Sequence, residues 1–107
     1  MNITVLLVDD VEAIRQSVGS MLLETGRFQV IGEAVDGLEA VQKAEELQPD
    51  LILLDIRLPK LDGIAAARQI RKLSPKSKIV FLTGNDDPEM VEEALSTCPP
   101  QKIRPLI

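Results

Sequence analysis

Acidic and hydroxyl side chains follow three short apolar runs of the chain. Asp9 and Asp10 come directly after the first run, Asp55 after the second, and Thr83 with Gly84 after the third. Carboxylates that lie close together repel one another unless a cation joins them. Oxygen ligands are those preferred by a hard divalent ion such as Mg²⁺. If the three runs are neighbouring strands of one sheet, these residues predict a magnesium site at its edge.

Each of these side chains also has an ordinary structural interpretation. Asp10 could cap a helix that follows it. Asp55 could belong to a turn ahead of Pro59, and Thr83 could form a turn through its hydroxyl. No single residue decides between the two interpretations, but the convergence of three strand ends favours a site.

Composition excludes several other kinds of chemistry. The 107 residues include 12 Lys and Arg and 17 Asp and Glu, and this net charge of −5 disfavours binding to nucleic acid. His is absent, which excludes Ser-His-Asp triads and His-ligated zinc. Cys98 is the only cysteine, which is typical of a reducing compartment, and no apolar run approaches the roughly 20 residues of a membrane span. We therefore expect one acidic cytoplasmic domain that contacts neither membrane nor nucleic acid.

Apolar runs alternate with stretches of helical periodicity. The pattern predicts strands at 5–8, 28–32, 51–54 and 79–82 and helices at 11–22, 38–47, 64–73 and 88–95. Continuous apolar strands are typical of strands covered on both faces. Strand–helix alternation with short connections predicts an α/β fold with a doubly wound parallel sheet, whose ligands bind at the carboxyl ends of the strands.

Several motifs together resemble the receiver domain of two-component response regulators. They are LLVDD at 6–10, GEAVDGLEA at 32–40, PDLILLDIRLP at 49–59, LDG at 61–63 and VFLTG at 80–84. Their order and spacing agree with the family over residues 3–96, and the details are similar to receivers of LuxR/NarL-type transcription factors. The resemblance implies a flavodoxin-like receiver fold with strand order 2-1-3-4-5.

The resemblance also implies a role for each acidic residue. Asp55 would accept a phosphoryl group from a histidine of a sensor histidine kinase, because a carboxylate is a suitable nucleophile that forms an acyl phosphate. Asp10, helped by Asp9, would hold Mg²⁺ together with Asp55 and the backbone carbonyl of Arg57. Such a domain would not be an enzyme beyond self-phosphorylation from a phosphodonor and slow self-dephosphorylation.

The remaining residues of the motifs would bind phosphate or adjust the reaction. Thr83, beside Gly84, would donate a hydrogen bond to a phosphoryl oxygen and report phosphorylation by moving. Arg57 and Asn85 occupy positions that tune the hydrolysis of the acyl phosphate in the family. Pro59 and Gly63 would shape the loop over the site.

The sequence departs from the family pattern after residue 96. Where the family has a fifth strand with an aromatic residue, then a lysine and a fifth helix, this chain reads TCPPQKIRPLI at 97–107. Prolines oppose a central parallel strand. We therefore expect a receiver core over 1–96, an atypical Pro-rich tail over 97–107, no normal fifth strand or fifth helix, and no output domain. Lys102 is the nearest candidate for the missing phosphate-binding lysine, and its alternative is a solvated lysine of the tail.

This departure suggests a second hypothesis. Without a fifth strand, the edge of the fourth strand would be open to pairing with another chain. The chain would then be a truncated or phosphorylation-independent binding module that forms a homodimer or a domain-swapped dimer through that edge.

A flavin binder is disfavoured by the acidic strand ends and the few aromatic residues. A haloacid-dehalogenase-like phosphatase is disfavoured because it needs an Asp where this chain has Arg57.

Overall fold

The computed structural model describes residues 2–56 and 58–82. The elements in chain order are β1 (Ile3–Val8), α1 (Glu12–Thr25), β2 (Phe28–Ala34), α2 (Gly37–Leu47), β3 (Leu51–Asp55), α3 (Gly63–Leu73) and β4 (Lys78–Leu82). Each one overlaps an element that the apolar pattern predicts. The predicted helix at 88–95 and the tail at 97–107 lie outside the described residues.

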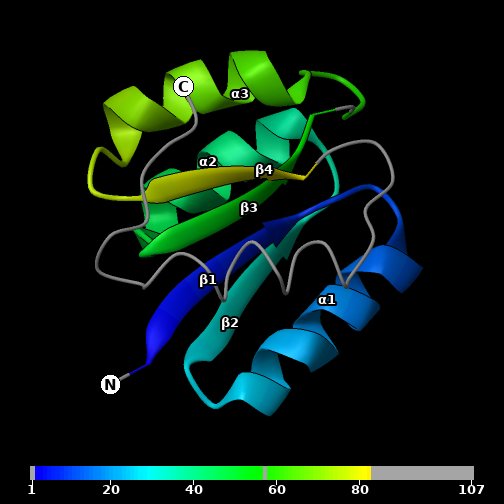
Figure 1. Cartoon of the computed structure of the whole chain (residues 1–107). Helices are drawn as coiled ribbons and strands as arrows, with labels where there is room; N and C mark the ends of the chain where they lie inside the picture. Colours follow the sequence, from blue (N-terminus) through cyan, green and yellow to red (C-terminus); the bar gives the residue numbers. More distant parts are fainter. Residues whose placement is uncertain (1, 57, 83–107) are drawn as a thin grey trace.

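The strands form a parallel sheet with the order β2-β1-β3-β4 over the described part of the chain. Val8 lies opposite Leu54, and Asp55 lies opposite Leu82, so the carboxyl ends of the three strands meet at one edge. Helix α1 covers one face of the sheet, and α2 and α3 cover the other (Figure 1). The predicted doubly wound parallel architecture is confirmed for these seven elements.

The two central strands are buried on both faces. Successive side chains of a strand point to opposite sides, so Leu6 of β1 and Ile52 of β3 pack beneath α2 and α3, while Leu7 and Leu53 pack on the α1 side. All four are at most 2% exposed. This two-sided burial explains why β1 and β3 appear in the sequence as uninterrupted apolar runs.

The helices begin and end at residues suited to those places. The Asp36 side chain accepts a hydrogen bond from the Glu39 N–H at the start of α2, and Asp62 accepts one from the Ala65 N–H at the start of α3. Helix α1 is followed by Gly26 as its C-cap residue, whose φ of 71° is the left-handed conformation that glycine adopts without strain. No helix in the described ranges is long and apolar enough to cross a bilayer.

Candidate functional site

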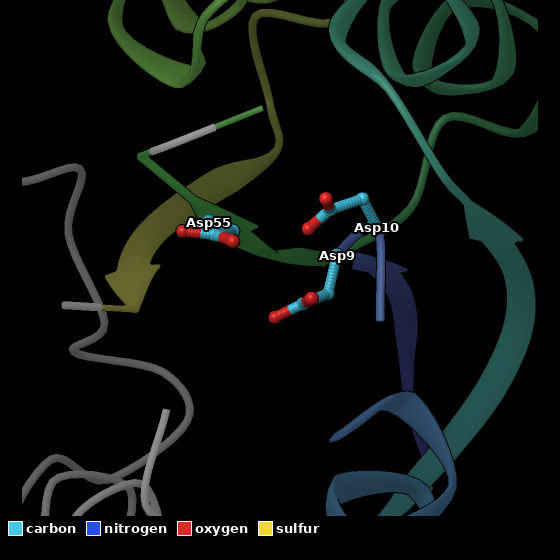
Figure 2. Close-up of side chains that lie close together, drawn as sticks. All are labelled: Asp9, Asp10 and Asp55. Carbon is cyan, nitrogen blue, oxygen red and sulfur yellow. The ribbon is translucent and has the colours of Figure 1, made fainter. Parts of the chain in front are cut away.

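Three carboxylates lie together at the carboxyl edge of the central strands. One oxygen each of Asp9, Asp10 and Asp55 lies within 4.8 Å of the others, and Figure 2 shows the side chains gathered at this edge. Asp9 and Asp55 are only 2% and 4% exposed, whereas Asp10 is exposed to solvent. The pairing of β1 with β3 produces this cluster, because it aligns the ends of the two strands.

The donor set fits a hard divalent cation. All three groups offer carboxylate oxygens, which are the ligands that Mg²⁺ takes in proteins. Two of the carboxylates are removed from water, so their mutual repulsion is weakly screened. The third is open to solvent and leaves an approach for an ion. Asp9, Asp10 and Asp55 are therefore the residues that would hold Mg²⁺ here.

The backbone of Asp9 is held by two neighbouring elements. Its N–H donates to the Ala34 carbonyl of β2 at 3.1 Å, and its carbonyl accepts from Nη1 of Arg15 on α1 at 2.6 Å. Its carboxylate Oδ1 also accepts from the Val11 N–H at 2.9 Å. The turn between β1 and α1 is thus hydrogen-bonded to β2 and to α1, and a further hydrogen bond lies within the turn.

The structure decides two of the alternative interpretations. Helix α1 begins at Glu12, and its N-cap residue is Val11 without a side-chain cap. The capping role considered for Asp10 is therefore wrong, because the helix starts two residues after it. Asp55 is the last residue of β3 and pairs with Leu82, so it is a strand residue and not part of a turn.

The loop after β3 packs closely against the start of α3. The Gly63 N–H donates to the Ile56 carbonyl at 2.8 Å. A Cβ atom at Gly63 would lie 2.3 Å from the carbonyl oxygen of Asp55, which is closer than any side chain tolerates. Glycine is therefore required at this point so that the helix can start directly against the backbone of the site.

The same loop also packs against the start of α2. The Gly37 N–H donates to the Pro59 carbonyl at 3.4 Å, and a Cβ at Gly37 would lie 1.8 Å from the carbonyl oxygen of Leu61. Lys60 adopts a φ of 67° and its ammonium lies 3.5 Å from the Asp36 carboxylate. These contacts join the loop beside Asp55 to α2.

The environment of Asp36 favours its charged form. The hydrogen bond from the Glu39 N–H holds the pKa of Asp36 below its ordinary value, and the charge of Lys60 acts in the same direction. Desolvation of the carboxylate opposes both effects without reversing them. Asp36 is therefore a capping residue that is also paired with the loop.

Five residues with predicted roles lie outside the described ranges. They are Arg57, Thr83, Gly84, Asn85 and Lys102, and their roles stay predictions. Sequence reasoning missed Arg15 and the Lys60–Asp36 pair. The Asp36-Gly37 dipeptide is a signal for a helix start, but no spacing rule links an arginine on a helix to a carbonyl six residues earlier.

Comparisons with known proteins agree on one family. The model of the response regulator receiver domain matches residues 5–98. The response regulator protein VraR of Staphylococcus aureus is 42% identical over 95 residues, which cover 89% of this chain and 46% of VraR. The chain thus spans about half the length of that relative.

Solved structures show the same likeness. A DNA-binding response regulator of the LuxR family from Staphylococcus aureus has a TM-score of 0.72 and 26% identity, with 88% of this chain and 78% of that chain covered. The receiver domain of the sensor histidine kinase PA1611 from Pseudomonas aeruginosa PAO1 has a TM-score of 0.75 and 26% identity, with 91% and 97% covered. That structure contains a magnesium ion coordinated in the active site cleft.

Proposed function

The chain belongs to the response regulator receiver domain family, and from this premise we propose that Asp55 accepts the phosphoryl group while Mg²⁺ is bound beside it. Membership confirms the resemblance drawn from the sequence motifs, including the likeness to LuxR-type regulators, and it confirms the flavodoxin-like receiver fold. The chain is a receiver of two-component signal transduction. Receiver domains are not classical enzymes, and self-phosphorylation with slow self-dephosphorylation belongs to the proposal.

The observation that carries this proposal is the cluster of Asp9, Asp10 and Asp55 within 4.8 Å. A carboxylate oxygen of Asp55 attacks phosphorus and forms a new O–P bond. The bond from phosphorus to the imidazole nitrogen of the donor breaks, and its electron pair stays on that nitrogen. Bound Mg²⁺ would neutralise charge on the transferring group, which is the main requirement of phosphoryl transfer. Asp9 and Asp10 would hold the ion beside Asp55, which is 4% exposed.

The donor and the location follow from the same proposal. We propose a sensor histidine kinase as the phosphodonor, because its phosphohistidine supplies the labile P–N bond that the carboxylate replaces. A cytoplasmic location agrees with Cys98 as the only cysteine. The magnesium ion in the PA1611 receiver supports the choice of metal.

The proposal is tested with acetyl phosphate as a small phosphodonor. The protein is incubated with acetyl phosphate and Mg²⁺, and its intact mass is measured with and without a chelator. We expect the protein to gain the mass of one phosphoryl group when Mg²⁺ is available. In the reaction that contains the chelator, we expect little or no gain in mass. Asp55→Asn should abolish the adduct, because an amide is not a nucleophile for phosphorus.

Asp62→Asn is the matched control for this substitution. Asp62 caps α3 in the neighbouring loop, and asparagine caps a helix as well as aspartate does. The control removes one carboxylate near the site and leaves the cluster intact, so it should keep the adduct. A wild-type protein that gains no phosphoryl group, or an Asp55→Asn protein that still gains one, contradicts the proposal.

A further inference from the structure

Arg15 on α1 joins the turn of the acidic cluster to the neighbouring strand. Its Nη1 donates to the Asp9 carbonyl at 2.6 Å, and its Nε donates to the Glu33 carboxylate of β2 at 2.9 Å. The arginine side chain is only 12% exposed, whereas the Glu33 side chain is 53% exposed. The guanidinium is thus largely enclosed, and it donates to one acceptor in the turn after β1 and to another on β2.

The bond to the Asp9 carbonyl acts on the peptide that joins Asp9 to Asp10. A peptide unit is planar, so fixing its oxygen fixes the orientation of the whole plane. The Cα atoms at the two ends of that plane carry the side chains of Asp9 and Asp10. The direction in which both side chains leave the backbone therefore depends on where the guanidinium of Arg15 holds this oxygen.

Glu33 keeps the guanidinium in place. Arginine presents its N–H groups in a rigid planar fork, so the bond from Nε to Glu33 sets the direction in which Nη1 points. The Glu33 carbonyl in turn accepts a hydrogen bond from the Lys43 ammonium of α2. The support behind the turn thus extends from α1 through β2 to α2.

We propose that Arg15 is a positioning residue of the metal site, which holds the Asp9–Asp10 turn so that its carboxylates meet Asp55. This inference rests on the proposed function, because it concerns the same cluster. Arg15 does not touch the ion or the phosphoryl group in this role. It acts through the backbone of Asp9, in the way that residues behind metal ligands orient those ligands.

The direction in which Mg²⁺ affinity changes when Arg15 is replaced distinguishes positioning from simple electrostatics. Arg15 carries a positive charge close to the cluster, so its removal alone would strengthen the attraction for Mg²⁺. Loss of positioning would instead weaken Mg²⁺ binding. Arg15→Lys keeps the charge and a good helix former, but its single ammonium lacks the fork that spans Asp9 and Glu33.

The experiment titrates Mg²⁺ into the whole chain by calorimetry, without a phosphodonor. Arg15→Gln should weaken Mg²⁺ affinity by about 10-fold or more, within the roughly 10- to 100-fold typical of residues behind metal ligands. Arg15→Lys should weaken it in the same direction. At saturating Mg²⁺, both variants should recover most of the wild-type rate of phosphorylation by acetyl phosphate, because the defect lies in binding the ion.

Arg27→Gln is the matched control for loss of an arginine. Arg27 directly precedes β2, so it lies at the amino end of the strands, away from the acidic cluster at their carboxyl ends. Its guanidinium lies 5.4 Å from the centre of the Phe28 ring. Its substitution should leave Mg²⁺ affinity unchanged. Thermal unfolding of each apo protein shows whether a variant is folded, and Arg15→Lys serves if Arg15→Gln is not.

Two results would overturn the inference. The first is an affinity for Mg²⁺ in both Arg15 variants that is equal to or tighter than that of the wild type. The second is a loss of Mg²⁺ affinity in Arg27→Gln that is as large as the loss in Arg15→Gln. A wild type that binds Mg²⁺ but gains no phosphoryl group would contradict the proposed function alone, because the titration contains no phosphodonor.

Discussion

Asp36 links the charge of a single side chain to the stability of the region beside the site. Its carboxylate accepts from the Glu39 N–H at 2.8 Å and lies 3.5 Å from the ammonium of Lys60. Both contacts favour the ionised form, and the pKa of Asp36 is therefore lowered from its ordinary value of 3.8. A lowered folded-state pKa means that the ionised carboxylate stabilises the fold at every pH above the ordinary value. This stabilisation is lost as the pH falls through the lower folded-state pKa.

The variant Asp36→Asn tests this dependence. Asparagine keeps the capping hydrogen bond but has no charge for Lys60. We expect the wild type to have the higher Tm at neutral pH, and the difference in Tm to shrink below about pH 3.8 and then disappear. Circular dichroism melts of both proteins from neutral to acidic pH measure it. A difference that stays constant over the whole range would show that the charge of Asp36 contributes nothing.

At the scale of elements, the loop after β3 is held between the starts of two helices. Gly37 of α2 and Gly63 of α3 each face loop or strand backbone at a distance that leaves no room for a Cβ atom. Strand β3, the loop after it and both helices therefore keep fixed positions relative to one another. Glycine at these two places is a requirement of close packing and not of an unusual φ.

Substitutions of two helical glycines should act in opposite directions. Gly37→Ala places a Cβ against the carbonyl oxygen of Leu61 and should lower the free energy of unfolding by about 1–3 kcal/mol, as overpacking does. Among the described residues, the new methyl group of Gly19→Ala in α1 meets only the Leu7 side chain, at an ordinary 3.7 Å. This variant should therefore raise the free energy of unfolding by about 0.5–1 kcal/mol. Urea unfolding followed by circular dichroism measures both. Equal destabilisation by the two variants would contradict the packing described here.

Elements were predictable where burial leaves a regular pattern. The run at 51–54 led directly to β3, because a strand buried on both faces is apolar throughout. The run at 79–82 led to β4, although three of the five residues of that strand are only partly buried. The end of β2 was placed too early, at residue 32, because Glu33 interrupts the apolar run while the strand continues to Ala34. The edge position of β2 explains this, since an edge strand exposes part of its side chains.

The contacts behind the site were less accessible to sequence reasoning. Parallel topology alone predicted that Asp9, Asp10 and Asp55 meet, because strand ends align. The bond from Arg15 to Asp9 depends on the rotamer of a long side chain, and the pair of Lys60 with Asp36 joins residues 24 positions apart. Neither contact produces a periodic pattern in the sequence from which it could be predicted.

At the scale of the whole molecule, one sheet supports two separate apolar cores. Leu6 belongs to the core beneath α2 and α3, and Leu53 belongs to the core on the α1 side. Both side chains are fully buried, while Leu23 on α1 is 76% exposed. Self-association through the outer edge of β4 stays a prediction, because it depends on residues outside the described ranges.

Truncation of these leucines tests the two-sided core. Leu6→Ala and Leu53→Ala should each lower the free energy of unfolding by about 2–5 kcal/mol, since each leaves a cavity. Leu23→Ala should change it by less than about 0.5 kcal/mol, as is usual for exposed positions. Urea denaturation of the three variants provides the values. A cost confined to one face of the sheet would contradict the two-core arrangement.

In the proposed function, Asp55 accepts the phosphoryl group beside the carboxylates of Asp9 and Asp10. The most direct measurement is to treat the protein with acetyl phosphate and Mg²⁺, reduce the acyl phosphate with borohydride, and locate the reduced residue by peptide mass spectrometry. We expect position 55 alone to be converted, and only in samples that contained Mg²⁺. Conversion at another aspartate, or no conversion in a folded protein with Mg²⁺ bound, would contradict it.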